Sequence, residues 1–266
     1  MNKLNRRHIK YDGDILPNTL IWRYMNFAKF IDFLITKSLW FSKIDRFNDE
    51  KEGYLELNNF HKYCYLKAEG DDYSLKFTDS FDEQDDDIDF SDFIKQMYEK
   101  TRKNIKNIYV NSWHISDVEN ELMWLAYGED KNSVAIRCEF QSLLNFFQSE
   151  EYYNFDIRAI NYYDHKEIRF ELLDRLAPAF TKRKRFKSEN ELRLIAYRFE
   201  GIDQDNDNYK VIEDENGKVL SGIKIDLDFD NSKYEVVVSP YSEEWFAELI
   251  MEIGKKYQFD VVLSER

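Results

Sequence analysis

The sequence predicts an α+β domain with a mainly antiparallel, split or curved sheet, flanking helices and a helical insertion. Strand-like and helix-like segments follow one another in mixed order along the chain. The pair Asn216-Gly217, between two strand-like runs, is a strong hairpin signal because both positions tolerate positive φ. Gly and Pro are scarce, at 8 and 3 residues, so no flexible linker divides the chain.

Length and composition favour a single domain over residues 1–266. The chain is 43% hydrophobic and 17% aromatic, and its aromatic residues are spread from end to end. A chain of this length can bury about three quarters of its unfolded surface in one core.

The first elements are a strand, a helix and a second strand. Residues 20–25 read as a strand and residues 39–44 as another, and between them residues 27–35 repeat apolar side chains near the helical period. The pattern from Tyr54 to about Val110 is helical, which predicts a helical insertion at about 54–108. The acidic run at 79–92 repels itself and favours an exposed, mobile loop.

The second half continues the mixed order. Residues 109–114 read as a strand, and Ser116 and Glu119 match a capping box that opens a helix closed by Gly128. The remaining expected strands are 134–140, 156–164, 191–199, 209–227 and 260–263, and the remaining helices are 142–147, 167–186 with Pro178 as an interruption, and 239–259.

A charged motif stands out in the run that precedes the strand at 191–199. Glu189 and Glu191 are two residues apart at the mouth of this strand, so they point to the same side and can share one cleft. Five cations precede or flank them: Lys182, Arg183, Lys184, Arg185 and Lys187. In a chain of net charge -14, such a basic collar suits a phosphate-bearing substrate. The structural alternative is that Glu189 or Glu191 pairs with Arg193 or Arg185.

Charge and cysteine content argue against several classes of protein. An isoelectric point near 4.9 disfavours a protein dedicated to duplex DNA. Cys64 and Cys138 are the only cysteines and no apolar leader precedes them, which favours a reducing cytoplasm. No apolar run is long enough to cross a membrane. The four histidines are far apart and neither cysteine has a partner at metal-ligand spacing, so no metal is expected.

Several sequence blocks resemble those of the bacterial and phage domain-of-unknown-function family numbered 2971. They cover nearly the whole chain in the same order: IWRYMNFAKFIDFLITKSLWFSKIDRFNDEKEG, NSWHISDVENELMWLAYG, VAIRC, KRKRFKSENELR and SPYSEEWF. A family of unknown function supplies no mechanism.

A second resemblance does imply a mechanism. Arg23, Ser42 and Glu189-x-Glu191 resemble the Arg, Ser and Glu-x-Glu elements of the mono-ADP-ribosyltransferase superfamily. The resemblance implies that Arg23 contacts the ribose or pyrophosphate of NAD and that Ser42 supports the nicotinamide side. The helix between their strands has only enough length to return the chain alongside itself, so Arg23 and Ser42 are expected at adjacent strand ends, facing one cleft with Glu191. It implies also that Glu191 hydrogen-bonds the ribose and that Glu189 helps to activate an acceptor.

The chemistry of these residue types agrees with that assignment. Loss of nicotinamide passes through an oxocarbenium-like state, which a carboxylate stabilises. Arginine suits a pyrophosphate because its fork donates two parallel bonds, and Lys184 and Arg185 of the basic run are expected to help hold the phosphates. The leading hypothesis is an NAD-dependent ADP-ribosyltransferase-like enzyme, an effector in bacterial defence or toxin systems, that modifies an unknown protein or nucleic-acid acceptor.

Two other functions remain open. His114, between a strand and the capped helix, is either a general acid or base or a packing residue. With Glu189, Glu191 and the basic run it could form a metal-dependent or His-assisted nuclease acting on RNA or single-stranded DNA. The third hypothesis is a non-enzymatic sensor that binds a protein through exposed aromatic residues.

Overall fold

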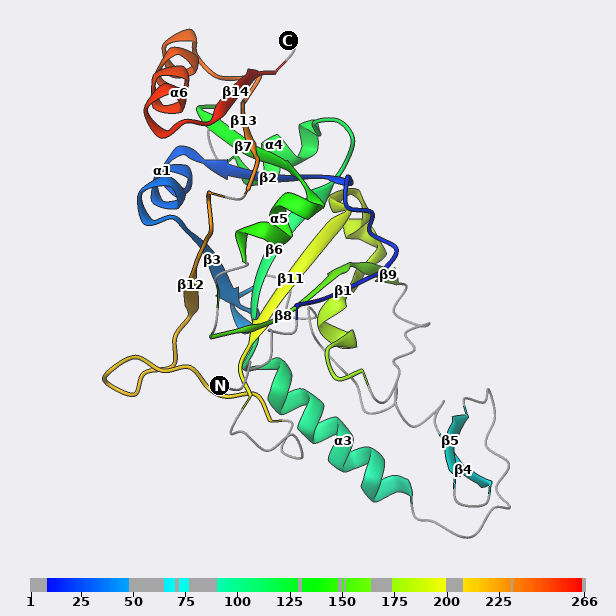
Figure 1. The fold of residues 1–266 in the computed structure, drawn as a ribbon. Helices are drawn as coiled ribbons and strands as arrows, with labels where there is room; N and C mark the ends of the chain where they lie inside the picture. Colours follow the sequence, from blue (N-terminus) through cyan, green and yellow to red (C-terminus); the bar gives the residue numbers. More distant parts are fainter. Residues whose placement is uncertain are drawn as a thin grey trace, which may run out of the picture.

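The fold is α+β, as predicted, with a mostly antiparallel mixed sheet and flanking helices (Figure 1). The computed structural model describes residues 9–47, 65–69, 72–76, 90–128, 131–147, 150, 152–163, 174–199, 208–230 and 232–264.

The main sheet contains ten strands. Its central path runs β1 (Ile9–Tyr11), β8 (Asn154–Ala159), β11 (Glu191–Tyr197), β6 (Tyr109–Ile115), β2 (Leu20–Asn26), β7 (Ser133–Glu139), β13 (Glu235–Val238) and β14 (Asp260–Leu263), and β3 (Ser38–Lys43) and β12 (Gly222–Asp226) branch from it. The pairs β1–β8 and β13–β14 at its two ends are parallel, and the other pairs in this sheet are antiparallel.

The sheet is split along one edge of β6. Strand β2 pairs with the end of β6, at His114 and Ile115, whereas β3 pairs with its beginning, at Tyr109 and Val110. The two strands therefore diverge from a shared neighbour, and β12 extends the branch that β3 begins. This divergence opens the middle of β6 to the site described below.

Helices cover the sheet because their apolar side chains recur at helical spacing. In α1 (Phe27–Thr36), Phe30, Phe33 and Leu34 are buried, and the Asn26 side chain caps the helix by accepting from the Lys29 N–H. Helices α5 (Phe140–Phe146) and α6 (Glu244–Tyr257) contribute to the same core. The rings of Phe27 and Phe246 pack edge to face with centroids 5.4 Å apart, which joins α1 to α6.

Two smaller cores fill the opposite side of the sheet. Helix α4 (Glu121–Tyr127) packs Met123 and Trp124 against Trp22 and Tyr24 of β2. The other small core lies around the start of β6 and includes Ile105, at the end of α3 (Phe90–Ile105). Among the described helices, none is long and apolar enough to span a membrane.

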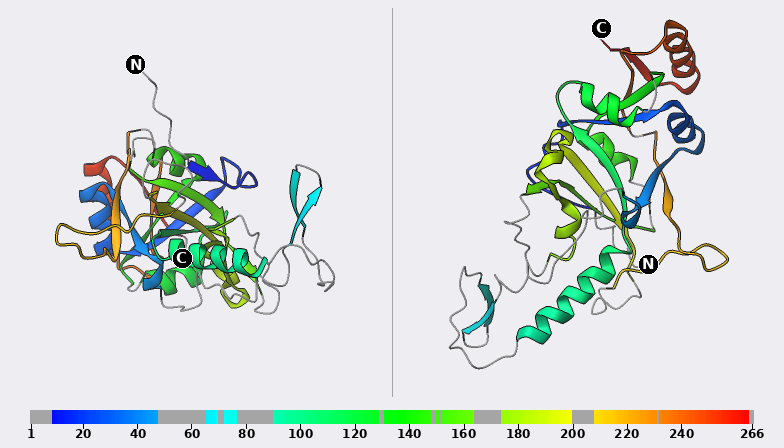
Figure 2. Two further views of the ribbon diagram at one scale, coloured as in Figure 1. Left: turned by 90° about the horizontal axis from the view of Figure 1, so that it is seen from below. Right: turned by 180° about the vertical axis from the view of Figure 1, so that it is seen from behind.

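The expected helical insertion is only partly helical. Helix α3 extends away from the sheet, as Figure 1 and the right view of Figure 2 show. However, β4 (Tyr65–Glu69) and β5 (Asp72–Lys76) form an antiparallel pair, so the prediction of helix from Tyr54 onward was wrong there. Gly70-Asp71 separates two Tyr- and Leu-containing runs, a hairpin signal that the helical interpretation missed. Most of the predicted acidic loop lies outside the described residues, and its last part, from Phe90, begins α3.

The predicted capping box is wrong. Helix α4 begins at Glu121, and its cap is Asn120, whose side chain accepts from the Leu122 N–H at 2.9 Å. The Glu119 carboxylate instead accepts from the Trp124 indole and from the Ser264 hydroxyl. Long-range contacts therefore overrode a local capping pattern.

The described part of the expected helix at 167–186 is also not α-helical. It forms the short 3₁₀ helix η2 (Ala177–Phe180), the strand β10 (Thr181–Arg183) and the 3₁₀ helix η3 (Lys184–Glu189). Pro178 has no backbone N–H to continue a helix. Strand β10 pairs with β9 (Asn161–Tyr163), so the expected strand at 156–164 is two strands that belong to different sheets.

The hairpin predicted at Asn216-Gly217 is a turn with φ +74° at Gly217. The Asp214 carboxylate accepts from the backbone N–H groups of Asn216 and Lys218. Only the last part of the expected strand region 209–227 forms a regular strand, β12.

Candidate functional site

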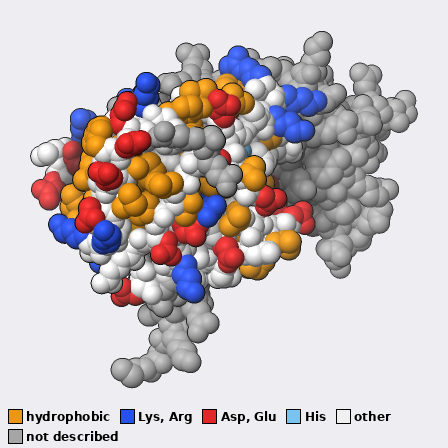
Figure 3. Space-filling view, turned by 90° about the horizontal axis from the view of Figure 1, so that it is seen from above, with side chains coloured by type: hydrophobic (Ala, Val, Ile, Leu, Met, Phe, Trp, Pro, Cys, Tyr) orange, Lys and Arg blue, Asp and Glu red, His pale blue; other side chains and the backbone are white. Residues whose placement is uncertain are grey.

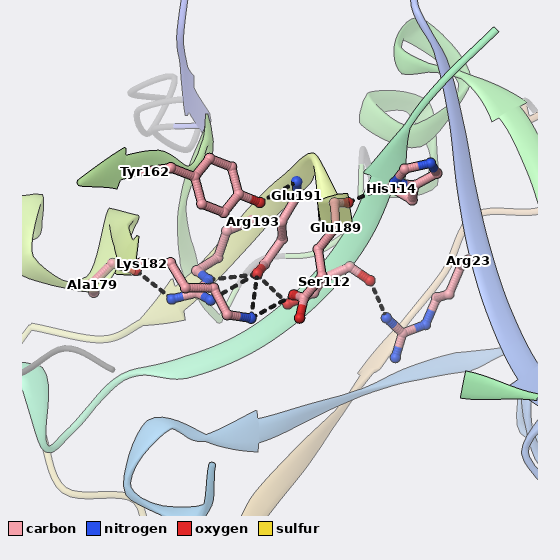
Figure 4. Close-up of polar contacts among 9 residues, drawn as sticks. All are labelled: Arg23, Ser112, His114, Tyr162, Ala179, Lys182, Glu189, Glu191 and Arg193. Carbon is pink, nitrogen blue, oxygen red and sulfur yellow. Dashed lines mark hydrogen bonds and ion pairs between the residues drawn. The ribbon is translucent and has the colours of Figure 1, made fainter. Parts of the chain in front are cut away.

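Backbone register places four polar side chains on one face of the sheet. Glu191 at the start of β11 lies opposite His114 of β6, and Arg193 lies opposite Ser112. Side chains alternate along both strands, so these four residues share a face while Leu192 and Trp113 point into the main core. Figure 4 shows this group together with Lys182, Glu189 and Arg23.

Glu191 is the anchor of a buried ionic network. Its Oε1 accepts from Arg193 Nε and from Ser112 Oγ, each at 2.6 Å. Its Oε2 accepts from Arg193 Nη2 at 3.0 Å and from Lys182 Nζ at 3.3 Å. The side chain of Glu191 is 3% exposed and that of Arg193 is 0% exposed. Both carboxylate oxygens are therefore occupied by protein donors.

The same contacts determine the protonation state of Glu191. Burial alone would raise its pKa, but the charges and hydrogen bonds of Arg193, the charge of Lys182 and the Ser112 hydroxyl together lower the pKa to about 2. Glu191 is thus ionised, and it balances cations that would otherwise be buried without a counter-charge. This arrangement is the structural pairing with Arg193 that the sequence left open.

The low pKa of Glu191 predicts acid-sensitive stability. The unfolded chain, with a carboxyl pKa of 4.5, binds more protons than the folded chain between about pH 4.5 and about pH 2. The contribution of Glu191 to the free energy of unfolding, about 3 kcal/mol, should therefore be complete above this window and be lost as the pH falls through it. Thermal unfolding at a series of pH values measures this loss, and Glu191→Gln should flatten the slope. An equally steep slope in the variant would contradict the assignment.

Glu189 differs from Glu191 in its exposure. Its carboxylate accepts from Lys182 Nζ at 2.5 Å, but its side chain remains 19% exposed. It ends η3, just before Asn190, which adopts the left-handed conformation with φ 36° and ψ 56°. Asn190 holds this turn by donating from Nδ2 to the Ile115 carbonyl at 2.6 Å. Glu189 is the more accessible of the two carboxylates predicted to be catalytic.

His114 holds the turn that carries Glu189. Its Nδ1 lies 2.5 Å from the Glu189 carbonyl oxygen, which can only accept, so Nδ1 carries the proton. The Nε2 atom then accepts from Asn120 Nδ2 at 3.4 Å. Burial lowers the pKa of His114, although the Glu189 carbonyl acts in the opposite direction. With 2% exposure, His114 connects the Glu189 turn to the cap of α4 and has little surface for a substrate.

One pocket brings together most of the residues predicted to be functional. It has a volume of about 930 Å³ and lies where β2 and β3 diverge from β6. The predicted site residues that line it are Arg23, Ser42, His114, Glu189 and Glu191. Such a volume lies within the range of about 300–1,000 Å³ that is usual for ligand pockets.

Arg23 enters this pocket from the other face of the sheet. Strand alternation places its Cβ with Ile21 and Met25, whose side chains belong to the main core, whereas its neighbour Trp22 is paired with His114. Its guanidinium nevertheless reaches the split and donates from Nη1 to the Ser112 carbonyl at 2.5 Å. Burial lowers the pKa of Arg23 to about 10, which leaves it a cation at neutral pH.

Ser42 lies on β3, across the split from Arg23. Its Oγ accepts from the indole Nε1 of Trp40 at 3.1 Å. Strands β2 and β3 are not paired with each other, because β6 is the neighbour of both. The expectation that Arg23 and Ser42 lie on adjacent strand ends is therefore wrong, although both line the pocket.

The two basic residues expected to hold phosphates do not line the pocket. Lys184 and Arg185 are exposed on η3. The Arg185 guanidinium lies over the Phe186 ring at 4.6 Å from its centroid. Lys182, by contrast, turns inward to the two glutamates. The basic run therefore has two parts: Lys182 is an internal counter-ion of the glutamates, whereas Lys184 and Arg185 lie on the surface.

The sequence did not point to several of the side chains that shape the site. Ser112, Trp40 and Arg46 line the pocket but were not expected there. The pairing of Glu191 with Arg193 was one of the alternatives that the sequence left open, because the two are opposite charges on one face of an otherwise apolar strand. Among the described residues, no group of three or more His, Cys, Asp or Glu side chains is arranged to hold a metal ion.

Comparisons of the chain with models of protein families, with curated proteins and with solved structures gave no match. The two family resemblances of the sequence therefore stay predictions.

Proposed function

We propose that the pocket at the split of the sheet binds NAD and that the protein is an ADP-ribosyltransferase-like enzyme. The observation that carries this proposal is the convergence of Arg23, Ser42, Glu189 and Glu191 on one pocket. These residues come from three segments of the chain. They meet because the pocket lies in the space between β2 and β3, which pair with different ends of β6.

The charge of the pocket supports an anionic ligand. Among the residues that the structure describes, its lining contains five cationic and three acidic side chains: Arg23, Lys29, Arg46, Lys182 and Arg193, against Asp32, Glu189 and Glu191. The chain as a whole has a net charge of -14, so the pocket is more basic than the rest of the protein. A local excess of cations attracts the negative charges of a pyrophosphate, which the acidic remainder of the protein surface repels.

Exposure assigns different roles to the two glutamates. Glu191 has no unoccupied carboxylate oxygen and keeps Lys182 and Arg193 in place. Glu189 is the carboxylate that can face the ribose. In the proposed step the bond between ribose C1′ and the nicotinamide nitrogen breaks, and its electron pair leaves with neutral nicotinamide. A nucleophile of a protein or nucleic-acid acceptor, or water, then bonds to C1′ and loses its proton, while Glu189 stabilises the cationic state between the two events.

Labelled NAD tests this proposal. We expect purified protein to bind NAD in a calorimetric titration and, with cell extract, to move the ADP-ribosyl label to protein or nucleic acid, or to release free ADP-ribose. A protein that neither binds NAD nor consumes it under these conditions would overturn the proposal.

The nuclease alternative has weaker support. Its His-assisted form depends on His114 reaching a substrate, but His114 is buried and hydrogen-bonded through both ring nitrogens. The binding-module alternative relies on exposed apolar side chains. Hydrophobic groups are visible on the face drawn in Figure 3, and exposed ones occur on α4 (Leu122, Leu125) and α6 (Trp245, Leu249). No partner chemistry follows from them, and they lie outside the pocket lining.

A further inference from the structure

One exposed tryptophan forms part of the pocket wall. Trp40 of β3 is 45% exposed and lines the pocket. The chain has five tryptophans. Trp22, Trp113 and Trp124 are buried, and Trp245, at 57% exposure, is on α6 and does not line the pocket. Of the tryptophans that line the pocket, Trp40 is therefore the one whose ring is exposed enough for a ligand to cover.

The indole of Trp40 is oriented by a hydrogen bond from its Nε1 to Ser42 Oγ at 3.1 Å. Asn111 Nδ2 anchors the backbone of the same residue by donating to its carbonyl at 2.8 Å. On the neighbouring strand β12, Gly222 pairs with Ser42 and is the diagonal neighbour of Trp40. A Cβ at Gly222 would lie 2.0 Å from Trp40 Cζ2, so the ring occupies space that only glycine leaves open.

A fixed aromatic ring beside cations is the arrangement that recognises a nucleotide. Bases stack on aromatic rings, and Arg or Lys groups bind the phosphates. Besides Trp40 the pocket lining includes the cations Arg23, Lys29 and Arg46.

We propose that Trp40 is a stacking platform for the heteroaromatic base of a free nucleotide, with the cations of the pocket on its phosphates. The inference rests on the proposed function only for the identity of that nucleotide as NAD. The roles of Ser42 and Gly222 follow from it: they orient the indole and do not touch the reacting atoms.

Tryptophan fluorescence tests the platform directly. The variant Trp245→Phe leaves Trp40 as the only extensively exposed tryptophan. In this background we expect NAD and AMP to protect the emission from quenching by acrylamide. Ribose 5-phosphate, which has a phosphate but no base, should give no protection.

Calorimetry gives the size of the effect. Trp40→Ala should weaken the binding of AMP and NAD by at least about 5-fold and leave the binding of ribose 5-phosphate unchanged. Trp40→Phe should retain most of the affinity, since it keeps a ring. Gly222→Ala should weaken AMP binding although the indole is still present, because the new methyl group displaces it. Trp245→Ala is the matched control and should bind as the wild type does.

Several outcomes would overturn the platform. They are an unchanged AMP affinity in Trp40→Ala, equal binding of AMP and ribose 5-phosphate, no binding of either, or protection of Trp40 by a single-stranded oligonucleotide but not by AMP. Failure of the transferase proposal looks different. AMP binding that depends on Trp40, without consumption of NAD, would reject the enzyme and keep the platform. NAD turnover with an unchanged KM in Trp40→Ala would keep the enzyme and reject the platform.

Discussion

Glu191→Gln is expected to destabilise the protein strongly. The substitution removes the negative charge that balances Arg193 and Lys182, both of them buried. Breaking a buried ion pair from one side costs about 3–5 kcal/mol, because the remaining charge is left uncompensated. For a chain of this size the melting temperature should fall by roughly 6 °C or more. Thermal unfolding at neutral pH measures this.

A double-mutant cycle separates the pair from general damage to the fold. Arg193→Met alone should also destabilise, since it removes the nearer of the two cations that are described beside the buried Glu191. The double variant should lose less stability than the sum of the two single variants, by about 1–3 kcal/mol. If Glu191→Gln instead melts as the wild type does while NAD turnover disappears, Glu191 is catalytic and its structural role is rejected.

Glu189→Gln should have the opposite profile. This variant keeps the shape of a partly exposed side chain and removes the charge proposed to stabilise the oxocarbenium-like state. We expect the rate of NAD consumption to fall by roughly two powers of ten or more, equivalent to about 3 kcal/mol of transition-state stabilisation. The melting temperature should fall less than in Glu191→Gln, because Glu189 is 19% exposed and Lys182 keeps Glu191 as its counter-charge.

NAD affinity is the control for this variant. It should stay within a few-fold of the wild type, since the cations of the pocket hold the phosphates. Full turnover by Glu189→Gln would remove Glu189 from the chemistry. Loss of NAD binding together with turnover would show that Glu189 acts in binding and that the proposed transition-state role is wrong.

The two glutamates illustrate what local sequence can predict. Their two-residue spacing at the start of a strand predicted a shared side, and both line one pocket. Strand alternation is not the reason, however, because Glu189 ends η3 and the left-handed Asn190 separates it from β11. The distinction between the two roles was not predictable, because it depends on Ser112 and Lys182. These donors reach Glu191 through strand pairing and through the turn after β10.

Local patterns failed where distant contacts competed with them. The pattern at Ser116 and Glu119 does not cap α4, and Asn120 caps it instead. The Glu119 carboxylate accepts hydrogen bonds from Trp124 and from Ser264, which is far away in sequence. The basic run looked like a uniform collar. Only the folded chain turns Lys182 inward and leaves Lys184 and Arg185 exposed.

The sequence by itself determined the α+β class and the identity of most strands and helices, because hydrophobic periodicity is a local property. Tertiary structure decided where the sheet splits, that Arg23 reaches the pocket from the opposite face, and that Gly222 leaves room for the Trp40 ring. These features depend on strand order and register, which bring together residues far apart in the chain, and no local pattern encodes which strands become neighbours.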